Sequence, residues 1–227
     1  MLYKGTVESS TFSLLEQLMN DSRLGKFNLA GGTAIALYLG HRKSIDLDLF
    51  TPDSFNVREL EDYLRTNYDF KTDFTEKDTL KGSVNGVKLD CITYNYPNIN
   101  KLTITNEGIR IYSIDDIVAM KLSAIAHNGT RLKDFIDIAC LSTRMSFNDM
   151  LAAYGKKFPG SNSIIAAKGI EYYADINFND KIEMINGNYK WDMIEKRLHN
   201  MVKRGDTIFH GLPIEENKIN MGRGLKL

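Results

Sequence analysis

Cysteine and histidine are scarce in this chain of 227 residues, and neither forms a recognisable motif. Cys91 and Cys140 lie far apart within apolar stretches, so we interpret them as buried thiols rather than as a disulfide or a metal pair. The four histidines are scattered along the chain, which excludes the usual zinc-binding spacings. Such sparing use of cysteine suits a reducing compartment and predicts a cytoplasmic protein.

Long apolar stretches and the common catalytic loops are also missing. The N-terminal sequence MLYKGTVESS lacks the apolar core of a signal peptide, and no run approaches the ~18–20 apolar residues that cross a membrane. There is no Gly-Lys-Ser/Thr phosphate loop and no Gly-x-Ser-x-Gly nucleophile elbow. We therefore expect neither a signal peptide nor a membrane partner, and neither P-loop nor α/β-hydrolase chemistry.

An excess of either charge is absent as well, because 29 basic side chains balance 29 acidic ones. The whole chain therefore produces no field that would draw it onto nucleic acid, and any RNA contact has to be local. Each basic cluster in the C-terminal half could supply such a contact or could equally be a solvated helix face. These clusters are Lys156-Lys157, Lys168, Lys196-Arg197 and Lys203-Arg204.

The sequence does contain enough apolar material for a core, arranged as an α/β N-terminal half and a helical C-terminal half. Hydrophobic residues make up 43% of the chain, whose length fits one large domain or two small ones. We place a core domain over 1–110 and a helical region over 111–227. Apolar spacing and capping signals predict helices over 11–19 and 33–39, after Asn56 and Ser113, and over 131–142, 147–156, 163–174 and 191–202. Strands are expected over 26–30, over 44–50 and within 70–94, where Asn85-Gly86 marks a hairpin.

The segment LAGGTAIALYLGHRKSIDLDLF, residues 29–50, carries the strongest functional signal. Its Gly31-Gly32-Thr33 turn lets the backbone approach a phosphate where a helix N-terminus offers free N–H groups. Asp46 and Asp48 alternate with aliphatic residues at positions 45, 47 and 49, so in a strand both carboxylates project from one face. Adjacent carboxylates repel each other unless a cation lies between them, and Mg²⁺ prefers such oxygen ligands. The segment therefore predicts a site for a nucleoside triphosphate and its metal.

Strand alternation suggests further residues for this site. Asp90 lies on the second arm of the expected hairpin, where it adds a third carboxylate if its two neighbours face the core. Ser44 precedes Asp46 by two residues and Arg42 precedes Ser44 by two, so both are candidates for phosphate contacts. For His41 we favour a structural or solvent-exposed role over a catalytic one.

Lys121 lies on the apolar face of the helix expected after Ser113, because it follows Ile117 and Val118 by four and three residues. Burying an unpaired ammonium is costly, and a triphosphate is one partner that would compensate the charge. Periodicity alone leaves a lysine that snorkels from the edge of the apolar stripe equally open.

Two motifs carry a family resemblance. Gly32-Thr33, followed after twelve residues by Asp46-Leu47-Asp48, resembles the signature of the nucleotidyltransferase superfamily, with Asp90 in place of its third acid. The string from His41 to Leu49 and the later motif Arg131-Leu-Lys133-Asp134-Phe-Ile-Asp137 are similar to the AbiEii-type nucleotidyltransferases. Those proteins are the toxins of type IV abortive-infection toxin–antitoxin systems.

This resemblance, which covers residues 29 to about 142, implies a polymerase-β-like α/β core with a mixed sheet, completed by the helical C-terminal region. It implies transfer of an NMP from an NTP to a hydroxyl with one or two Mg²⁺ ions, most simply onto tRNA, and a cognate antitoxin as partner. A protein acceptor, a small-molecule acceptor of the antibiotic type, and a catalytically silent nucleotide-binding module stay open as alternatives.

The motifs and the resemblance together assign roles to twelve residues. Catalysis falls to Asp46, Asp48, Asp90, Lys121 and Asp134, the metal to Asp46, Asp48 and Asp90, and the nucleotide to Gly31, Gly32, Thr33, Arg42, Ser44, Lys121, Arg131 and Lys133. Whether Asp90 or Asp134 is the third catalytic acid stays open, because the superfamily uses the strand acid and this family the later one. For Lys133, a surface pair with Asp137 at i, i+4 is an equally good interpretation.

Overall fold

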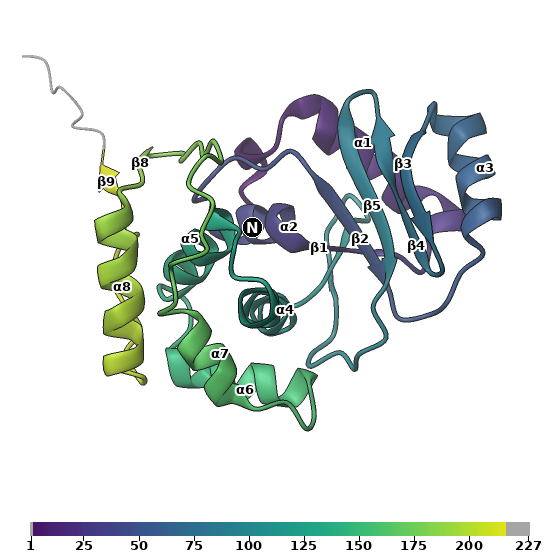
Figure 1. Cartoon of the computed structure of the whole chain (residues 1–227). Coiled ribbons are helices and arrows are strands. Elements are labelled where there is room, and N and C mark those ends of the chain that lie inside the picture. Colours follow the sequence, from purple (N-terminus) through teal and green to yellow (C-terminus); the bar gives the residue numbers. More distant parts are fainter. Residues whose placement is uncertain (1, 217–227) are drawn as a thin grey trace, which may run out of the picture.

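The computed structural model describes residues 2–216, which are organised around a seven-stranded mixed sheet (Figure 1). The strands lie in the order β3-β4-β5-β2-β1-β7-β6, with β2 parallel to β5 and antiparallel to β1. Their bounds are β1 Asn28–Ala30, β2 Leu47–Thr51, β3 Lys71–Glu76, β4 Thr79–Val84, β5 Val87–Thr93, β6 Thr103–Ile104 and β7 Arg110–Ile111. A second, two-stranded sheet pairs β8 (Gly187–Asn188) with β9 (Glu215–Glu216).

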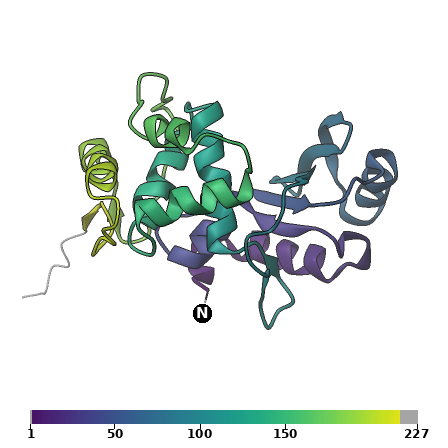
Figure 2. The same ribbon diagram turned by 90° about the horizontal axis from the view of Figure 1, so that it is seen from below.

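Helices flank this sheet and fill the C-terminal half of the described chain. Figures 1 and 2 show α1 and α3 beside the sheet, α4 to α8 gathered on the other side of the molecule, and α2 between the two groups. The helices are α1 Ser9–Asn20, α2 Gly31–Leu39, α3 Val57–Tyr68, α4 Ile114–His127, α5 Leu132–Leu141, α6 Phe147–Lys157, α7 Ser163–Gly169 and α8 Trp191–Lys203. Short 3-10 turns cover Lys4–Thr6 and Ser22–Leu24. None of the helices within residues 2–216 is long and apolar enough to cross a membrane.

The local signals read from the sequence are borne out at several ends of these elements. Asn56 and Ser113 both act as N-caps, since each side chain accepts a hydrogen bond from the backbone N–H three residues later. Gly40 ends α2 in the left-handed conformation with φ of 69°. Asn85-Gly86 forms the tight turn that pairs β4 with β5.

Two boundaries differ from the prediction. The strand expected over 44–50 begins only at Leu47, because the backbone N–H groups of Lys43 and Ser44 bond to Glu183 and Thr6 rather than to the sheet. Ile45 is consequently 59% exposed instead of filling the core face. The helix expected over 163–174 ends at Gly169, which packs closely against α4.

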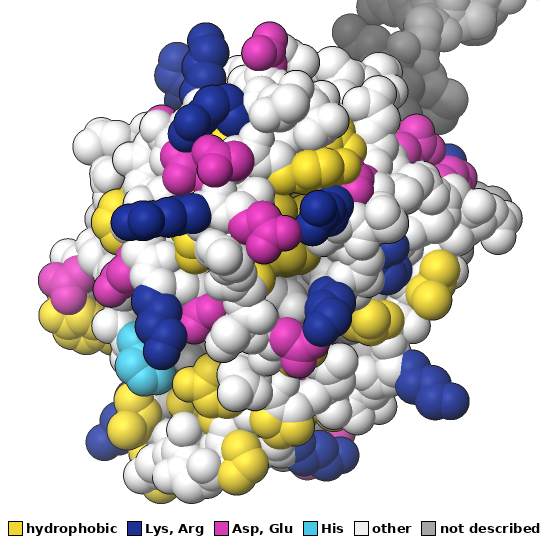
Figure 3. Space-filling model, turned by 90° about the vertical axis from the view of Figure 1, so that its right-hand side faces the viewer, with side chains coloured by type: hydrophobic (Ala, Val, Ile, Leu, Met, Phe, Trp, Pro, Cys, Tyr) yellow, Lys and Arg dark blue, Asp and Glu magenta, His cyan; other side chains and the backbone are white. Residues whose placement is uncertain are grey.

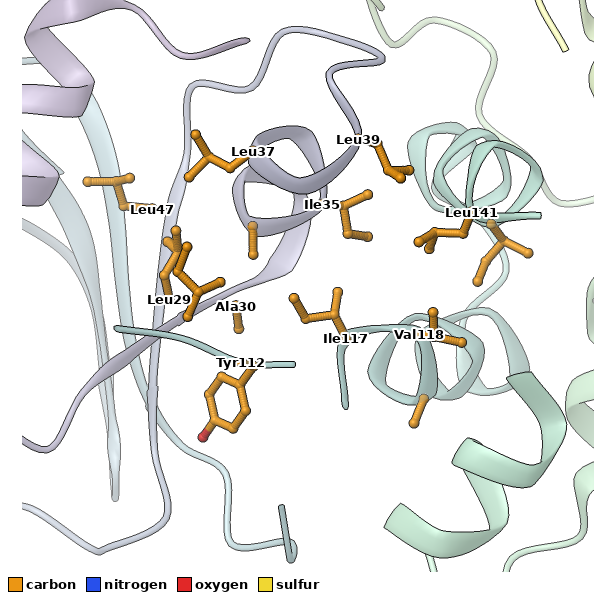
Figure 4. Packing of buried hydrophobic residues seen from close by; sticks show 14 of the residues in the cluster. Leu29, Ala30, Ile35, Leu37, Leu39, Leu47, Tyr112, Ile117, Val118 and Leu141 are labelled. Carbon is orange, nitrogen blue, oxygen red and sulfur yellow. The ribbon is translucent and has the colours of Figure 1, made fainter. Parts of the chain in front are cut away.

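One cluster of buried apolar side chains joins the sheet to the helices. Figure 4 shows Leu29 and Ile35 meeting Ile117, Val118 and Leu141 in the space between the sheet, α2, α4 and α5. All five side chains are at most 1% exposed. The contacts hold α2 against α4 and α5 and so bring the first motif of the sequence to the second.

The division at residue 110 stays a prediction. Strand β7 lies across it, and the buried cluster draws residues from both sides. The last part of the proposed helical region, residues 217–227, lies outside the described residues.

Candidate active site

A cavity of about 420 Å³ lies where the end of β1, strand β2 and helices α4 and α5 meet. Its polar lining includes backbone and side chains from both sequence motifs together with residues of α4, and its apolar lining is mostly aromatic. The polar residues used below are Gly31, Gly32, Asp48, Lys121, Arg131 and Asp134. Segments that are about a hundred residues apart in the chain thus meet at one site.

Gly31 and Gly32 begin α2 and form one wall of this cavity. Gly31 has φ of +67°, and a Cβ added there would lie 1.9 Å from Oδ2 of Asp48. A Cβ at Gly32 would lie 2.6 Å from Nη2 of Arg42. The absence of side chains therefore allows the helix N-terminus to approach the acidic strand. Ala30 provides no side-chain cap, so the first N–H groups of α2 are available to an anion.

Thr33 and Ser44, predicted to contact phosphate, lie behind this wall instead of lining the cavity. Thr33 is fully buried, and its hydroxyl oxygen lies 2.9 Å from Oγ of Ser44 and donates to the carbonyl of Asp46. Both hydroxyls therefore fix the backbone that leads into β2. Their contribution to the site is the position of the acidic strand.

The strand acids lie side by side across two strands. Asp48 on β2 is in register with Asp90 on the parallel strand β5, so both side chains project from the same face. Burial raises the pKa of the Asp48 carboxyl, with Lys121 opposing the shift and Asp90 adding to it. Asp90 is 5% exposed, its Oδ2 lies 3.4 Å from Nζ of Lys81, and its Oδ1 has no hydrogen-bond partner. An unpartnered buried carboxylate oxygen beside a second carboxylate fits a cation.

Asp46 precedes β2 and occupies a different position from the two strand acids. It lines a separate hollow of about 280 Å³, where Lys133 approaches its Oδ2 to 3.8 Å. Within residues 2–216, no three acidic, histidine or cysteine side chains lie close enough together to hold a metal ion. The donors therefore fit Mg²⁺ in its common mode, in which one or two carboxylates and substrate phosphates share the ion.

Lys121 is 5% exposed and makes a buried ion pair with Asp134, while Nζ lies 3.0 Å from Oδ2 of Asp137. The prediction of a lysine on the apolar face is confirmed, and the snorkelling alternative is wrong because the ammonium is enclosed. Its charge is compensated by these two aspartates, where the prediction had named a triphosphate. Burial would lower the pKa of this ammonium, but the charges of Asp134 and Asp137 outweigh it and raise the pKa. Oδ2 of Asp134 has no hydrogen-bond partner, so this carboxylate keeps one free acceptor at the cavity.

Asp137 is the centre of a charge network that the sequence reading did not include. It is fully buried and accepts hydrogen bonds from His41 Nε2 at 2.8 Å and from Arg42 Nε and Nη2 at 2.7 and 2.9 Å. Burial acts to raise the pKa of this carboxyl, yet the charges of Arg42 and Lys121 hold the pKa well below its usual range. Asp137 belongs to the second motif, and that motif was the signal that could have identified it.

Arg42 is therefore not placed as expected. Its guanidinium is 4% exposed, lies behind Gly32 and is engaged by Asp137, and it borders the second hollow instead of the cavity. The structural role favoured for His41 agrees with its complete burial in the same network. Both residues link the loop before β2 to helix α5.

The remaining predicted residues of the second motif are more exposed. Arg131 lines the cavity with a side chain that is 54% exposed, and its Nε lies 3.8 Å from Oδ2 of Asp134. Lys133 approaches Asp46 across the second hollow rather than Asp137, which is used by the buried network. The surface-pair interpretation of Lys133 thus names the wrong partner.

Sequence reasoning also missed the aromatic lining and misjudged one lysine. Phe50, Tyr94, Tyr96 and Phe158 line the cavity, and no periodic pattern connected them. Lys157, expected in a basic cluster, is fully buried: its ammonium lies 2.7 Å from Oδ1 of Asp116 and donates to the carbonyl of Pro97 at 3.1 Å. Lys157 therefore cannot serve as part of a basic surface.

Comparisons with known proteins agree with this geometry. A family model described as "Nucleotidyl transferase AbiEii toxin, Type IV TA system" matches residues 13–185. An uncharacterised protein of Aquifex aeolicus (strain VF5) is 32% identical over 170 residues, which cover 71% of this chain and 80% of that protein. A solved structure from H. pylori, assigned as a nucleotidyltransferase, is 16% identical and superposes with a TM-score of 0.50, covering 87% of this chain and 95% of its own. At this identity the structural likeness concerns the fold alone, and it confirms the predicted nucleotidyltransferase architecture.

Proposed function

The chain belongs to the AbiEii family of nucleotidyltransferase toxins of type IV toxin–antitoxin systems, and from this we propose that it transfers an NMP from an NTP to tRNA. The acceptor atom would be a hydroxyl at the tRNA 3′ end, and pyrophosphate would leave. A cognate antitoxin would restrain the activity, as membership of a toxin–antitoxin family implies.

The observation that carries the proposal is the convergence of both motifs on one cavity. The glycine-rich start of α2 supplies free N–H groups, and Lys121 and Arg131 supply positive charge on the same cavity. A triphosphate needs both kinds of partner, since its charge is spread over many oxygens. We assign the triphosphate to Gly31, Gly32, Lys121 and Arg131, with Lys121 neutralising the charge that develops on the leaving group.

A divalent cation would be shared between protein and substrate. Asp48 and Asp90 are the carboxylates in register on one face, and we assign Mg²⁺ to them, with Asp46 completing the set if a second ion binds. When bound, the ion supplies charge stabilisation at the phosphoryl oxygens and orients the attacking and leaving groups. We assign to Asp134 the orientation of Lys121, because the two form a buried ion pair beside the cavity.

The acceptor assignment depends on a local basic surface. Figure 3 shows acidic and basic side chains interspersed over the face that carries α3 and the β3–β4 hairpin, so that face offers no single-sign surface to RNA. Lys168 is exposed in a groove of about 450 Å³, which Asp175 also lines and which shares His127 with the active-site cavity. This groove is where we place the path of the RNA end.

The test is transfer of label from each α-³²P NTP, with Mg²⁺, to total RNA and to total protein. Wild-type protein is compared with Asp48→Asn and with Asp62→Asn, a matched change of an exposed acid on α3. We expect label in small RNA with the wild type and Asp62→Asn, and a loss of at least about a hundredfold with Asp48→Asn. Label in protein would move the target to a protein acceptor. No label in either pool, with small molecules also unlabelled, would contradict the proposed transfer.

A further inference from the structure

The cavity has two chemically different parts, and the proposed function uses only one of them. Asp48, Lys121, Arg131 and Asp134 form the charged part. The other part is formed largely by aromatic side chains, which a triphosphate does not require: Phe50, Tyr94, Tyr96 and Phe158. The question is what these rings bind.

The four rings form a continuous row. Phe50 and Tyr94 are stacked, with centroids 5.2 Å apart and an interplanar angle of 20°. Tyr94 and Tyr96 follow at 5.0 Å, and Tyr96 meets Phe158 edge-to-face at 4.9 Å. Phe158 is 6% exposed and anchors the row in the core, whereas Tyr96 is 46% exposed. A large aromatic ring left open to solvent beside a cavity is a natural contact for a planar ligand.

The strand geometry sets the distance between the row and the proposed metal ligands. Phe50 follows Asp48 by two residues on β2, so both project from the same sheet face roughly 7 Å apart. Just beyond β5, the backbone N–H of Tyr94 donates to the carbonyl of Thr51 at 2.7 Å, which places Tyr94 beside the end of β2. The row therefore begins, at Phe50, roughly 7 Å from the carboxylate assigned to Mg²⁺, which is close to the span of one ribose.

A buried ion pair holds the segment that carries the row. Lys157 donates to the carbonyl of Pro97, and Asp116 accepts from the backbone N–H of Ile99 at 2.9 Å. The Lys157 ammonium also lies 5.6 Å from the ring centroid of Tyr94. Both charged side chains are fully buried. The loop after β5 is thus fixed before any ligand binds, and a fixed platform loses less entropy on binding.

We propose that the nucleobase of the incoming NTP stacks against this aromatic row, next to Tyr96. The inference rests on the proposed function, because it concerns the second part of the same cavity. Stacking uses the π-face that every nucleobase has, so the row contributes to the affinity for all four NTPs. The terminal base of an RNA acceptor could use the same chemistry, but the row starts beside Asp48 at Phe50 and continues to Tyr96 within the same cavity, which favours the base of the NTP.

The test measures dissociation constants by calorimetry, with Mg²⁺ and without any acceptor. The ligands are each NTP and ribose 5′-triphosphate, which lacks the base. The proteins are the wild type, Tyr96→Leu, Tyr96→Phe and Phe74→Leu, the last being a matched change of an exposed ring on β3. Thermal melting of each variant checks that the fold is retained, which we expect because both altered side chains are about half exposed.

We expect the wild type to bind NTPs about tenfold or more tightly than ribose 5′-triphosphate. Tyr96→Leu should remove most of that difference and leave the binding of ribose 5′-triphosphate unchanged, while Tyr96→Phe and Phe74→Leu should behave as wild type. Equal binding of the two ligands by the wild type would overturn the stacking inference but leave the proposed transfer standing. Unchanged NTP binding by Tyr96→Leu would also overturn the inference, and a raised KM for RNA in the label-transfer assay would then assign the row to the acceptor. Failure of every triphosphate to bind would contradict the proposed function itself.

Discussion

Two lysines of this protein are buried on neighbouring helices, and each is paired with aspartate, yet they lie in different surroundings. Lys121 on α4 lines the cavity and contacts Asp134 and Asp137. Lys157 on α6 is enclosed completely, between Asp116, the carbonyl of Pro97 and the rings of Tyr94 and Tyr112. Burial and a carboxylate partner are common to both, so neither feature by itself identifies a functional lysine.

The difference lies in what remains unsatisfied. Around Lys157 the charges and the nearby backbone groups satisfy one another, because Asp116 also accepts from the N–H of Ile99. Around Lys121 one oxygen of Asp134 at the cavity has no hydrogen-bond partner, and the half-exposed Arg131 approaches it only to 3.8 Å. A buried pair that is complete stabilises one conformation, whereas a pair with free bonding capacity at a cavity is ready to interact with a ligand.

The largest expected effect is on turnover. Lys121→Met should lower the rate of nucleotide transfer about 10²–10³-fold, because in the proposed mechanism this cation stabilises developing charge in an enclosed site. Single-turnover transfer from labelled NTP measures the effect. Lys157→Met serves as the comparison: at saturating NTP its folded fraction should lose far less rate, because Lys157 does not line the cavity and only supports the loop that carries the aromatic row. Equal losses of rate in the two variants would erase the distinction between the lysines.

The complementary effect is on stability. Lys157→Met should lower the free energy of unfolding by about 3–5 kcal/mol, because Asp116 keeps its charge in a fully buried place. Adding Asp116→Asn should recover part of the loss, since the amide carries no charge and its oxygen still accepts from Ile99. Urea unfolding monitored by circular dichroism measures all three proteins. A loss below about 1 kcal/mol for Lys157→Met would show that the ion pair is hydrated.

A pH dependence should separate the two networks, because only the one around Lys121 contains a histidine. Burial lowers the pKa of His41, against the opposing charge of Asp137. As the pH falls below the unfolded value of about 6.5, the unfolded chain takes up a proton that the folded chain refuses, so stability is lost. We expect the free energy of unfolding to fall by up to about 1.4 kcal/mol per pH unit in this window.

That slope is measured by urea unfolding at several pH values between about 7 and 5. His41→Gln should flatten it, whereas His199→Gln, which alters an exposed histidine on α8, should not. An unchanged slope in His41→Gln would assign the pH dependence to other groups.

The smallest effect is expected at a third lysine, which is exposed. Lys133 lies 3.8 Å from Asp46 with both side chains about one-third exposed, and such pairs contribute little in water. Lys133→Ala should therefore change the free energy of unfolding by no more than about 0.5 kcal/mol. A larger loss, measured in the same urea experiment, would mean that the second hollow holds the pair more rigidly than its exposure indicates.

Local sequence patterns predicted much of the fold and part of the candidate site. The capping roles of Asn56, Ser113 and Gly40 depend on backbone groups a few residues away, so the local sequence was enough to predict them. The pairing of Gly31 with Asp48 was also signalled, because a helix-length spacer between a glycine turn and a strand returns the chain to the same place.

The roles of Arg42, Thr33 and Ser44 could not be read in this way. Alternation placed Arg42 and Ser44 on the acidic face, but the segment before Leu47 is not a strand and is bonded to distant backbone at Thr6 and Glu183. Thr33 was expected at a phosphate because it follows the glycine turn, yet its hydroxyl is used by Ser44 and the carbonyl of Asp46. Lys157 was misread for a similar reason, since its partner Asp116 is 41 residues away. Periodicity describes one element at a time, and it contains no information about which element packs against it.

The sequence by itself therefore determined the family, the α/β core and the two motifs, because these depend on short spacings along the chain. Only the tertiary structure decided which charged side chains face the cavity and which are paired with other groups inside the protein. Packing determines this difference, because a polar side chain is free to bind a ligand only where no distant segment already forms its hydrogen bonds or ion pairs. The aromatic row is the clearest case: Phe50, Tyr94, Tyr96 and Phe158 become one surface only after β2, the loop beyond β5 and the end of α6 have come together.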